Sequence, residues 1–210
     1  MSETLSMAKR EVKVPPTEYV SNIKGGEHGV MFYTSREDMR NIHFAFVKSG
    51  LENNWGVVYA APGSYSEELR NAMQSYGIDT KKYEENGSLF IQKGEEIYKD
   101  PAKPDLDSFK AQSSDVINYF MNMGKRGLRI ATDLTSFFLP RGLYVSLFDV
   151  EHLFQPRMDL PVTLICAYDA AIIPAVKDLD ITFFYKKINK EWRQFVDAHS
   201  FAQKNYPCCS

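Results

Sequence analysis

Short apolar segments alternate with longer amphipathic segments along most of this chain, and this alternation predicts strands and helices in turn. The apolar segments are residues 28–33, 55–61, 88–92, 127–132 and 161–167. Each is too short for a typical helix, and β-branched residues recur in several of them, as they do in strands. After the first segment, Met39, Ile42 and Phe46 repeat at helical spacing and place a broad apolar stripe on one face.

Local signals mark where several of the helices begin and end. Residues 34–37 and 64–67 both have the S/T-x-x-E form of a capping box, which opens a helix. Gly77 stands where the second of these helices should end in a left-handed residue. The other predicted elements are helices over residues 106–124 and 143–154 and a proline-containing surface loop over residues 95–105.

The order of the elements predicts one α/β domain of three layers, with a mainly parallel sheet between helices. Strand–helix–strand units with short connections form parallel pairs with right-handed crossovers. Segment 161–167 is the most hydrophobic, so we expect it to be central and buried on both faces. Residues 181–185 are a candidate last strand. The expected organisation is a flexible arm over 1–26, the domain over 27–186, and a C-terminal amphipathic helix and tail over 187–210.

Composition and charge narrow the class of protein. The chain has 210 residues, of which 44% are hydrophobic, and a net charge of −2. This charge argues against binding nucleic acid or an anionic membrane through bulk electrostatics. No apolar run approaches the roughly 18 residues of a membrane span, and the N-terminus lacks the apolar core of a signal peptide. We therefore expect a soluble cytoplasmic protein.

Candidate binding residues follow the predicted strands. Ligands of open α/β sheets bind beyond the carboxyl ends of the strands, so hydroxyls, phenols and carboxylates there form the candidate site. Asp133 and Asp169 have a second interpretation, because aspartate is also a preferred helix cap. Two carboxylates favour a neutral or cationic ligand over a triphosphate. The candidate ligand-binding residues are Tyr33, Thr34, Ser35, Asp133, Thr135, Tyr168 and Asp169.

The remaining candidates have plainer interpretations. His43 lies beside Met39 and Phe46 on its predicted helix and is read as a histidine at the edge of the core. Cys166 is read as a small buried hydrophobic residue. Cys208 and Cys209 are read as an inert tail, with reactivity or metal binding as the alternative. No spacing of His, Cys and carboxylates predicts a metal site, and no motif predicts a cofactor.

Four motifs together resemble a known family. They are HGVMFYTSRED, the helix–strand–helix stretch from Phe46 to Asp79, GLRIATDLTS and LPVTLICAYD. Their order and spacing resemble the MEDS domain, the methanogen/methylotroph, DcmR-type sensory domain, over roughly residues 27–185. The wider relatives of this family are KaiC-like and RecA-like P-loop ATPases. The resemblance implies a RecA-like sheet with Leu128–Thr132 in the Walker B position and segment 161–167 between that strand and 28–33. It also includes a histidine at His28, for which capping or packing is the physical interpretation.

The chain departs from the ATPase pattern at the phosphate-binding loop. A P-loop requires G-x-x-x-x-G-K-[ST] after the first strand, so that backbone N–H groups and a lysine hold phosphates. This chain has YTSREDM there, without glycine or lysine. Glu37 and Asp38 would also place negative charge where a phosphate binds. The sequence therefore predicts a degenerate P-loop and no enzymatic activity.

The favoured function is a non-catalytic sensory or regulatory module that binds a small molecule. In the family that the chain resembles, such domains are proposed to sense small molecules, including hydrocarbon derivatives, and are often joined to a DNA-binding or kinase output. This chain looks too short to carry an output, so we expect a protein partner, such as a kinase or transcriptional regulator, or a homo-oligomer. Two alternatives are a nucleotide-binding KaiC-like relative with an atypical P-loop and a structural pseudo-ATPase that docks on a partner.

Overall fold

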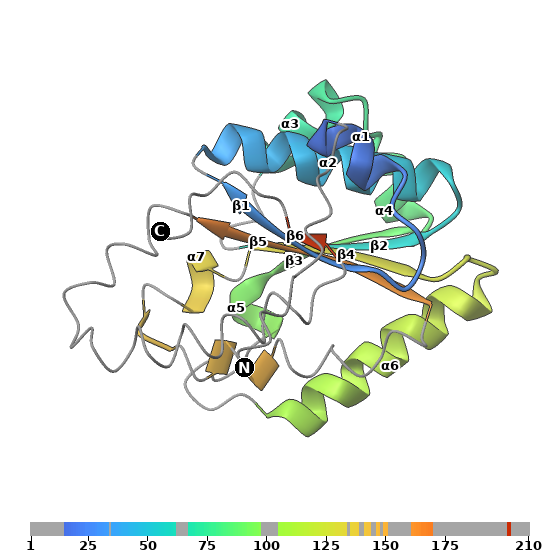
Figure 1. Cartoon of the computed structure of the whole chain (residues 1–210). Helices are drawn as coiled ribbons and strands as arrows, with labels where there is room; N and C mark the ends of the chain where they lie inside the picture. Colours follow the sequence, from blue (N-terminus) through green and yellow to red (C-terminus); the bar gives the residue numbers. More distant parts are fainter. Residues whose placement is uncertain are drawn as a thin grey trace, which may run out of the picture.

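A parallel β-sheet forms the middle layer of the molecule (Figure 1). The computed structural model describes residues 15–33, 35–61, 67–97, 105–133, 135–138, 141–143, 146–147, 149–150, 161–169 and 201–202. All the strand pairs are parallel, and the strand order is β3-β2-β4-β5-β1-β6. The strands are β1 (His28–Tyr33), β2 (Gly56–Ala61), β3 (Leu89–Lys93), β4 (Leu128–Asp133), β5 (Val162–Asp169) and β6 (Phe201–Ala202).

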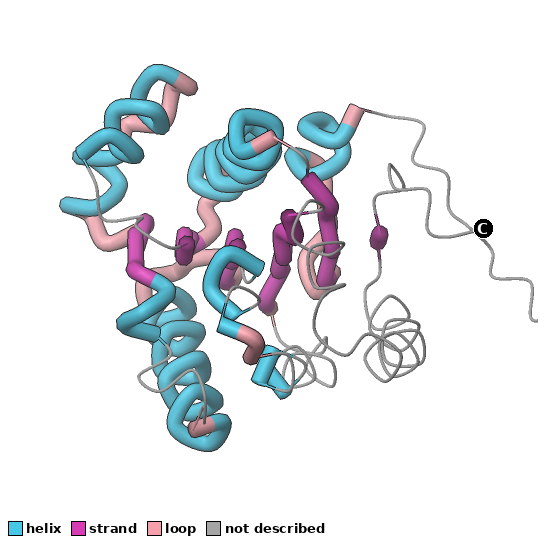
Figure 2. The backbone as a smooth tube through the Cα atoms, turned by 90° about the vertical axis from the view of Figure 1, so that its left-hand side faces the viewer, coloured by secondary structure: helices cyan, strands magenta, loops and turns pink. Residues whose placement is uncertain are grey.

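Helices cover both faces of this sheet, as Figures 1 and 2 show from two directions. One layer contains α1 (Pro16–Ser21), α2 (Arg36–Glu52), α3 (Glu67–Ser75) and α4 (Thr80–Glu85). The other contains α5 (Gly94–Ile97), α6 (Leu106–Asn122) and α7 (Thr135–Phe138). We call the two sides of the sheet the α2 face and the α6 face. The predicted three-layer fold with a parallel sheet is confirmed.

The larger part of the core lies on the α2 face. The predicted apolar stripe of α2 is buried there, and Phe46 and Val47 have no exposed surface. This stripe packs on residues of β2, β4 and β5, among them Tyr59 and Ile165. A smaller cluster lies on the α6 face, where Phe120 of α6 is fully buried against the sheet. The chain approaches so closely there that a Cβ at Gly56 would clash with the Phe120 ring.

The predicted strand segments 28–33, 55–61, 88–92, 127–132 and 161–167 all form strands, within two residues at each end. Strand β5 lies between β4 and β1, as the family resemblance implied. Gly77 has a φ of 89° directly after α3, as a left-handed helix end requires.

Several boundaries differ from the predictions. The N-cap of α2 is Ser35, whose side chain accepts a hydrogen bond from the Asp38 N–H, and not Thr34. The C-terminal part of the expected arm forms helix α1, with Val20 and Ile23 buried in the core. Helix α5 occupies the start of the expected loop 95–105, and α4 and β6 were not predicted. These elements are short, so few apolar positions are available to show a period.

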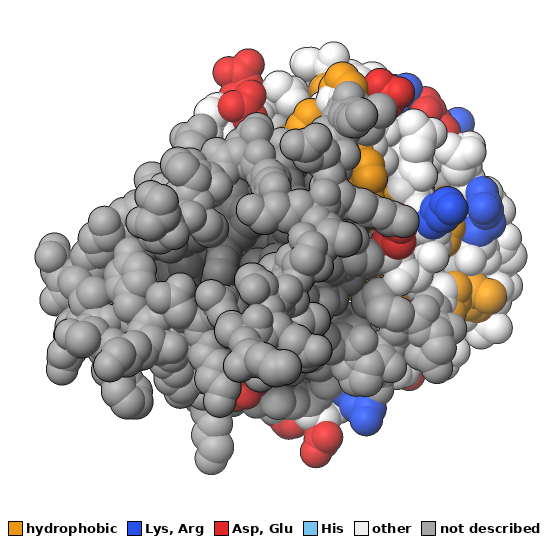
Figure 3. Space-filling model, viewed as in Figure 1, with side chains coloured by type: hydrophobic (Ala, Val, Ile, Leu, Met, Phe, Trp, Pro, Cys, Tyr) orange, Lys and Arg blue, Asp and Glu red, His pale blue; other side chains and the backbone are white. Residues whose placement is uncertain are grey.

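Other predictions fall outside the described residues. They are the cap at Ser64, most of the helix over 143–154, the strand over 181–185, the C-terminal helix, and Cys208 and Cys209. Among the residues that the structure describes, no helix is both long and apolar enough to cross a membrane. On the described surface seen in Figure 3, acidic and basic side chains are interspersed, so no field of one sign covers that part of the face.

Candidate functional site

Tyr33 and Asp133 meet at the carboxyl ends of β1 and β4. The Tyr33 hydroxyl donates a hydrogen bond of 2.9 Å to Oδ2 of Asp133. Both residues are only 4% exposed, so the carboxylate lies under the surface with a phenol as its partner. Strand β5 runs between the two strands, with Asp169 level with Tyr33 and Ala167 level with Asp133. The sequence named these strand ends, and the structure brings these two residues together.

The structure describes less about the other candidate ligand-binding residues that the sequence predicted. Ser35 acts as the N-cap of α2, which uses its side chain within the helix. Tyr168 and Asp169 end β5, and Thr135 begins α7, but their side chains lie outside the described part. Thr34 lies outside the described residues, and of His28 the structure describes only that β1 begins there. Their predicted roles stay predictions.

The surroundings of the Tyr33–Asp133 pair are closed. Tyr59 of β2 is 2% exposed, and burial together with the negative charge of Asp133 raises the pKa of its hydroxyl. His43 of α2 packs edge-on against the Tyr59 ring, with the ring centroids 5.7 Å apart. The α2 face therefore holds polar groups near the strand ends but keeps them from solvent.

His43 belongs to the core itself and not to its edge, which corrects the sequence interpretation. It has no exposed surface, and neither ring nitrogen has a hydrogen-bond partner among the described residues. Burial lowers the pKa of His43 from 6.5 to about 3, because the charged form would be unsolvated. The imidazole is therefore neutral at physiological pH and packs as an aromatic ring.

A second buried charge fixes the amino-terminal half of β4. Arg129 is 3% exposed, and its guanidinium donates to the Phe46 carbonyl at 3.1 Å, the Ser49 hydroxyl at 2.7 Å and the Ile23 carbonyl at 3.3 Å. No carboxylate of the described residues forms an ion pair with it. Burial, with a smaller contribution from Arg126, lowers its pKa to about 10, so Arg129 is still charged at neutral pH. Arg129 thus joins β4, α2 and the segment before β1.

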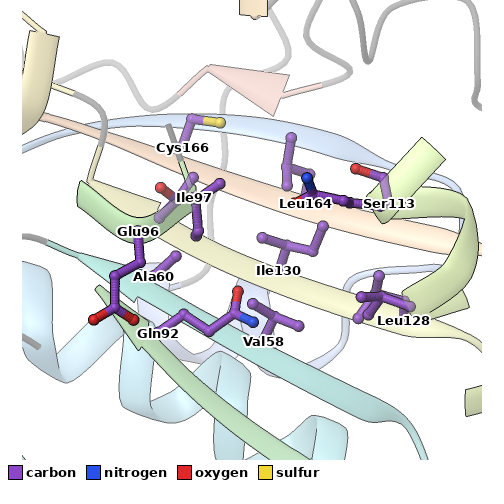
Figure 4. Close-up of a pocket in the computed structure, with 13 residues that line it drawn as sticks. Val58, Ala60, Gln92, Glu96, Ile97, Ser113, Leu128, Ile130, Leu164 and Cys166 are labelled. Atoms are coloured by element: carbon purple, nitrogen blue, oxygen red, sulfur yellow. The ribbon is translucent and has the colours of Figure 1, made fainter. Parts of the chain in front are cut away.

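The α6 face, in contrast, contains a cavity of about 170 Å³ between the sheet and helices α5 and α6 (Figure 4). The apolar floor comes from the strands: Val58, Ala60, Leu128, Ile130, Leu164 and Cys166. The helices contribute Glu96, Ile97, Gln112, Ser113 and Val116. Gln92 and Thr132 add an amide and a hydroxyl from β3 and β4. Neither Tyr33 nor Asp133 lines this cavity.

Sequence reasoning missed the residues of this cavity. The signal was present in β4, where Leu128, Ile130 and Thr132 alternate with Arg129 and Asp133. This alternation places a hydroxyl among apolar residues on one face and two charged groups on the other. Cys166 is fully buried, as predicted, but it forms part of the cavity wall. Phe137 and Phe138, which also follow β4, are buried without lining it.

Metal-ligating groups do not gather in the part of the chain that the structure describes, where no cluster of three His, Cys, Asp or Glu side chains is found. The described polar groups of the cavity are the amides of Gln92 and Gln112, the hydroxyls of Ser113 and Thr132, and the carboxylate of Glu96. This set suits hydrogen bonding to an organic molecule more than ion coordination, which for Mg²⁺ or Ca²⁺ relies on several oxygen ligands.

The strand order, the parallel pairing and the two helical layers define a three-layer α/β domain of the KaiC/RecA-like type. Within this class, the chain belongs to the MEDS family. The profile of the "MEthanogen/methylotroph, DcmR Sensory domain" matches residues 27–182, which confirms the family predicted from the four motifs. Membership in this family indicates a sensory or regulatory role.

Solved structures support the fold. Significant matches include 172 chains, among them the crystal structure of a KaiC-like protein from the hyperthermophilic archaeon Pyrococcus horikoshii OT3. This chain is 19% identical to it, with a TM-score of 0.51, over 70% of this chain and 63% of the archaeal one. The present chain thus matches less than two thirds of that protein, and the likeness concerns the fold alone. No curated protein matches this chain significantly.

Proposed function

We propose that this domain is a non-catalytic sensory module that binds a small organic molecule in the cavity on the α6 face. The observation that carries the proposal is the cavity itself: about 170 Å³ of space over an apolar sheet floor, with a few polar groups at its wall. Pockets for small molecules are mostly apolar, with a small number of polar groups that fix orientation. The family is named for sensing, and this cavity offers a place for the molecule that a sensory domain would detect.

The region where a RecA-like ATPase holds its nucleotide supports the non-catalytic reading. Ser35 caps the first turn of α2, and Glu37 and Asp38 stand in that turn. Negative side chains there repel phosphate, which P-loop proteins hold at this helix end. Asp133, in the position of the Walker B carboxylate, accepts a hydrogen bond from Tyr33. These contacts favour a degenerate site over a nucleotide site.

Signalling would then pass to a protein partner, such as a kinase or transcriptional regulator, or to a second copy of the chain. Nucleotide binding is retained as an alternative because the fold is similar to that of a KaiC-like protein. The pseudo-ATPase alternative needs no ligand, only a partner. Each of the three functions predicts a different behaviour of the purified protein.

The first experiment asks what the protein carries. The chain should be purified gently, denatured, and the released small molecules identified by mass spectrometry. We expect an organic molecule at a near-stoichiometric amount. The variant Ala60→Leu, which fills the cavity floor, should carry much less of it. Ala111→Leu is the matched control, because Ala111 is exposed on α6 and does not line the cavity.

Calorimetry with MgATP separates the alternatives. We expect no binding at micromolar concentrations. Tight MgATP binding that Asp133→Ala abolishes would replace the sensory function with the nucleotide-binding one. A protein that carries no small molecule, binds no MgATP and forms a stable hetero-complex would support the pseudo-ATPase function.

A further inference from the structure

We infer that the cavity on the α6 face selects an uncharged molecule of about the size of benzene that carries a hydrogen-bonding oxygen or nitrogen, and that Thr132 recognises this group. The inference rests on the proposed function and deepens it, because it names the ligand class and the residue that sets specificity. Three properties of the cavity carry it: its size, its charge and the hydroxyl that Thr132 places in its sheet floor.

Size sets the upper limit. The cavity measures about 170 Å³. An apolar protein cavity of about 150 Å³ binds benzene or xenon. The space inside this cavity therefore holds about one six-membered ring with one small substituent. Nucleotides and most cofactors are several times larger.

Charge excludes ions. Among the described lining residues, Glu96 alone is charged. Its carboxylate is 3.5 Å from the Lys93 ammonium, and its side chain is 64% exposed. In Figure 4 this carboxylate points away from Ile130 and Leu164. An ion placed on the apolar floor would lose its hydration without gaining an opposite charge, which is costly. The cavity thus favours a neutral molecule.

Thr132 supplies the polar contact. It is 7% exposed and lines the cavity. Its oxygen is not among the fully buried atoms of the described residues that lack a partner, so water can reach it from the cavity. A ligand that enters the cavity displaces this water, and a ligand oxygen or nitrogen that bonds to the hydroxyl replaces the hydrogen bond that the water made. A pure hydrocarbon of the same size does not. Thr132 lies in β4, between β2 and β5, and its position is therefore fixed by the sheet.

Gln92 offers a second polar contact at the edge of the sheet. Figure 4 shows its amide pointing toward Ile130 at the cavity floor. The amide both donates and accepts, so it tolerates either kind of polar group. Gln92 comes from the outermost strand β3. We therefore assign the selection of polar over apolar ligands to Thr132, which lies deeper in the sheet.

The test compares phenol with benzene, two probes that differ by one hydroxyl. Binding of each to the full chain is measured by calorimetry at pH 7, where phenol is neutral. We expect the wild-type protein to bind phenol about fivefold more tightly, as one hydrogen bond of about 1 kcal/mol implies. Thr132→Val keeps the shape and removes the hydroxyl. It should lose most of the preference for phenol, with benzene affinity unchanged or higher.

Thr163→Val is the matched control. Thr163 is likewise a buried threonine, in the neighbouring strand β5, but its hydroxyl donates to the Lys24 carbonyl at 3.3 Å, and it does not line the cavity. This variant should lower stability and keep the preference for phenol. A melting curve of each variant confirms that the protein titrated is folded.

The outcomes separate this inference from the proposed function. If the wild type binds the two probes equally, or if Thr132→Val keeps the preference, the role of Thr132 is wrong while the cavity remains a ligand site. Benzoate that binds as tightly as phenol would overturn the assignment of a neutral ligand. If neither phenol nor benzene binds to the folded protein, both this inference and the choice of this cavity for the proposed function fall.

Discussion

The two faces of the central sheet are filled in opposite ways, and strand β4 shows the contrast between neighbouring residues. On the α2 face, Arg129 donates to α2 and to the segment before β1, and Asp133 accepts from Tyr33. On the α6 face, Thr132 borders a cavity beside Leu128 and Ile130 of the same strand. On the α2 face Arg129, Asp133 and Tyr33 bond to other parts of the chain, although neither nitrogen of the buried His43 has a partner among the described residues. On the α6 face the Thr132 side chain faces a cavity instead.

This difference shows how a fold and its site can be separated. The α2 face contains the strand ends and helix N-terminus at which a RecA-like protein would hold phosphate. Here Ser35 caps that helix and Tyr33 engages the carboxylate. The described cavity lies on the other face. A shared fold therefore does not imply a shared site, and the site has to be argued from its own residues.

The strongest test of the closed face is Arg129→Ala. The change removes three hydrogen bonds, leaves two buried carbonyls without this donor, and opens a cavity. We expect the free energy of unfolding to fall by about 3 kcal/mol or more. Urea denaturation followed by circular dichroism measures it.

Arg126→Ala is its control. Arg126 is exposed and lies over the Trp55 ring, 5.5 Å from the centroid. Its loss should cost about 1 kcal/mol or less. Equal effects of the two substitutions would show that Arg129 does not hold the α2 face together.

The second test uses pH and His43. Unfolded His43 takes up a proton below pH 6.5, whereas the folded protein resists protonation down to about pH 3. Stability is therefore lost as the pH falls through this window, because only the unfolded state gains the proton. Between pH 7 and pH 5 the wild type should lose about 2 kcal/mol more than His43→Leu.

The carboxylates titrate in both the wild type and His43→Leu, so their contribution to the pH dependence of stability cancels when the two proteins are compared. Between pH 7.5 and 8.5 the two stability curves should run parallel, since His43 is neutral in both states there. Curves that also run parallel from pH 7 to pH 5 would mean that His43 has access to solvent or to a partner in solution.

The smallest of the three effects concerns the Tyr33–Asp133 hydrogen bond. Tyr33→Phe removes the donor to a buried carboxylate and should cost about 1.5 kcal/mol of unfolding free energy. Tyr119→Phe removes a hydroxyl from a residue that is 42% exposed, and should cost about 0.5 kcal/mol or less. If thermal or urea denaturation gives the same loss of unfolding free energy for both variants, water reaches the Tyr33–Asp133 hydrogen bond and the strand ends are not closed.

The sheet could be predicted because its strands are short, mostly apolar runs between helical segments, and a parallel arrangement brings their carboxyl ends to one edge. Because Tyr33 and Asp133 stand at the carboxyl ends of two parallel strands, this arrangement explains why they lie close together. The short helix α4 could not be predicted, because only Asp79 at its start gives a signal and its six residues are mostly polar. The same holds for α1, whose burial depends on Val20 and on packing against α2.

The cavity could not be predicted because it depends on how closely α5 and α6 approach the sheet. Small side chains at Ala60 and Cys166 leave room in the floor. Sequence periodicity shows which residues share a face, but not whether the opposite layer fills the space above them. The structural role of Arg129 was missed for a related reason: its partners are two backbone carbonyls and the Ser49 hydroxyl, which no sequence pattern connects with it.

Alternation along β4 also makes this domain sensitive to register. Because side chains alternate between faces, a slip of β4 by one position would turn every side chain to the other side. The guanidinium of Arg129 and the carboxylate of Asp133 would enter the apolar cavity, and Leu128, Ile130 and Thr132 would meet α2. A one-residue insertion or deletion within 128–133 should therefore prevent folding, whereas the same change after Gly124, in the turn that precedes the strand, leaves the alternation intact.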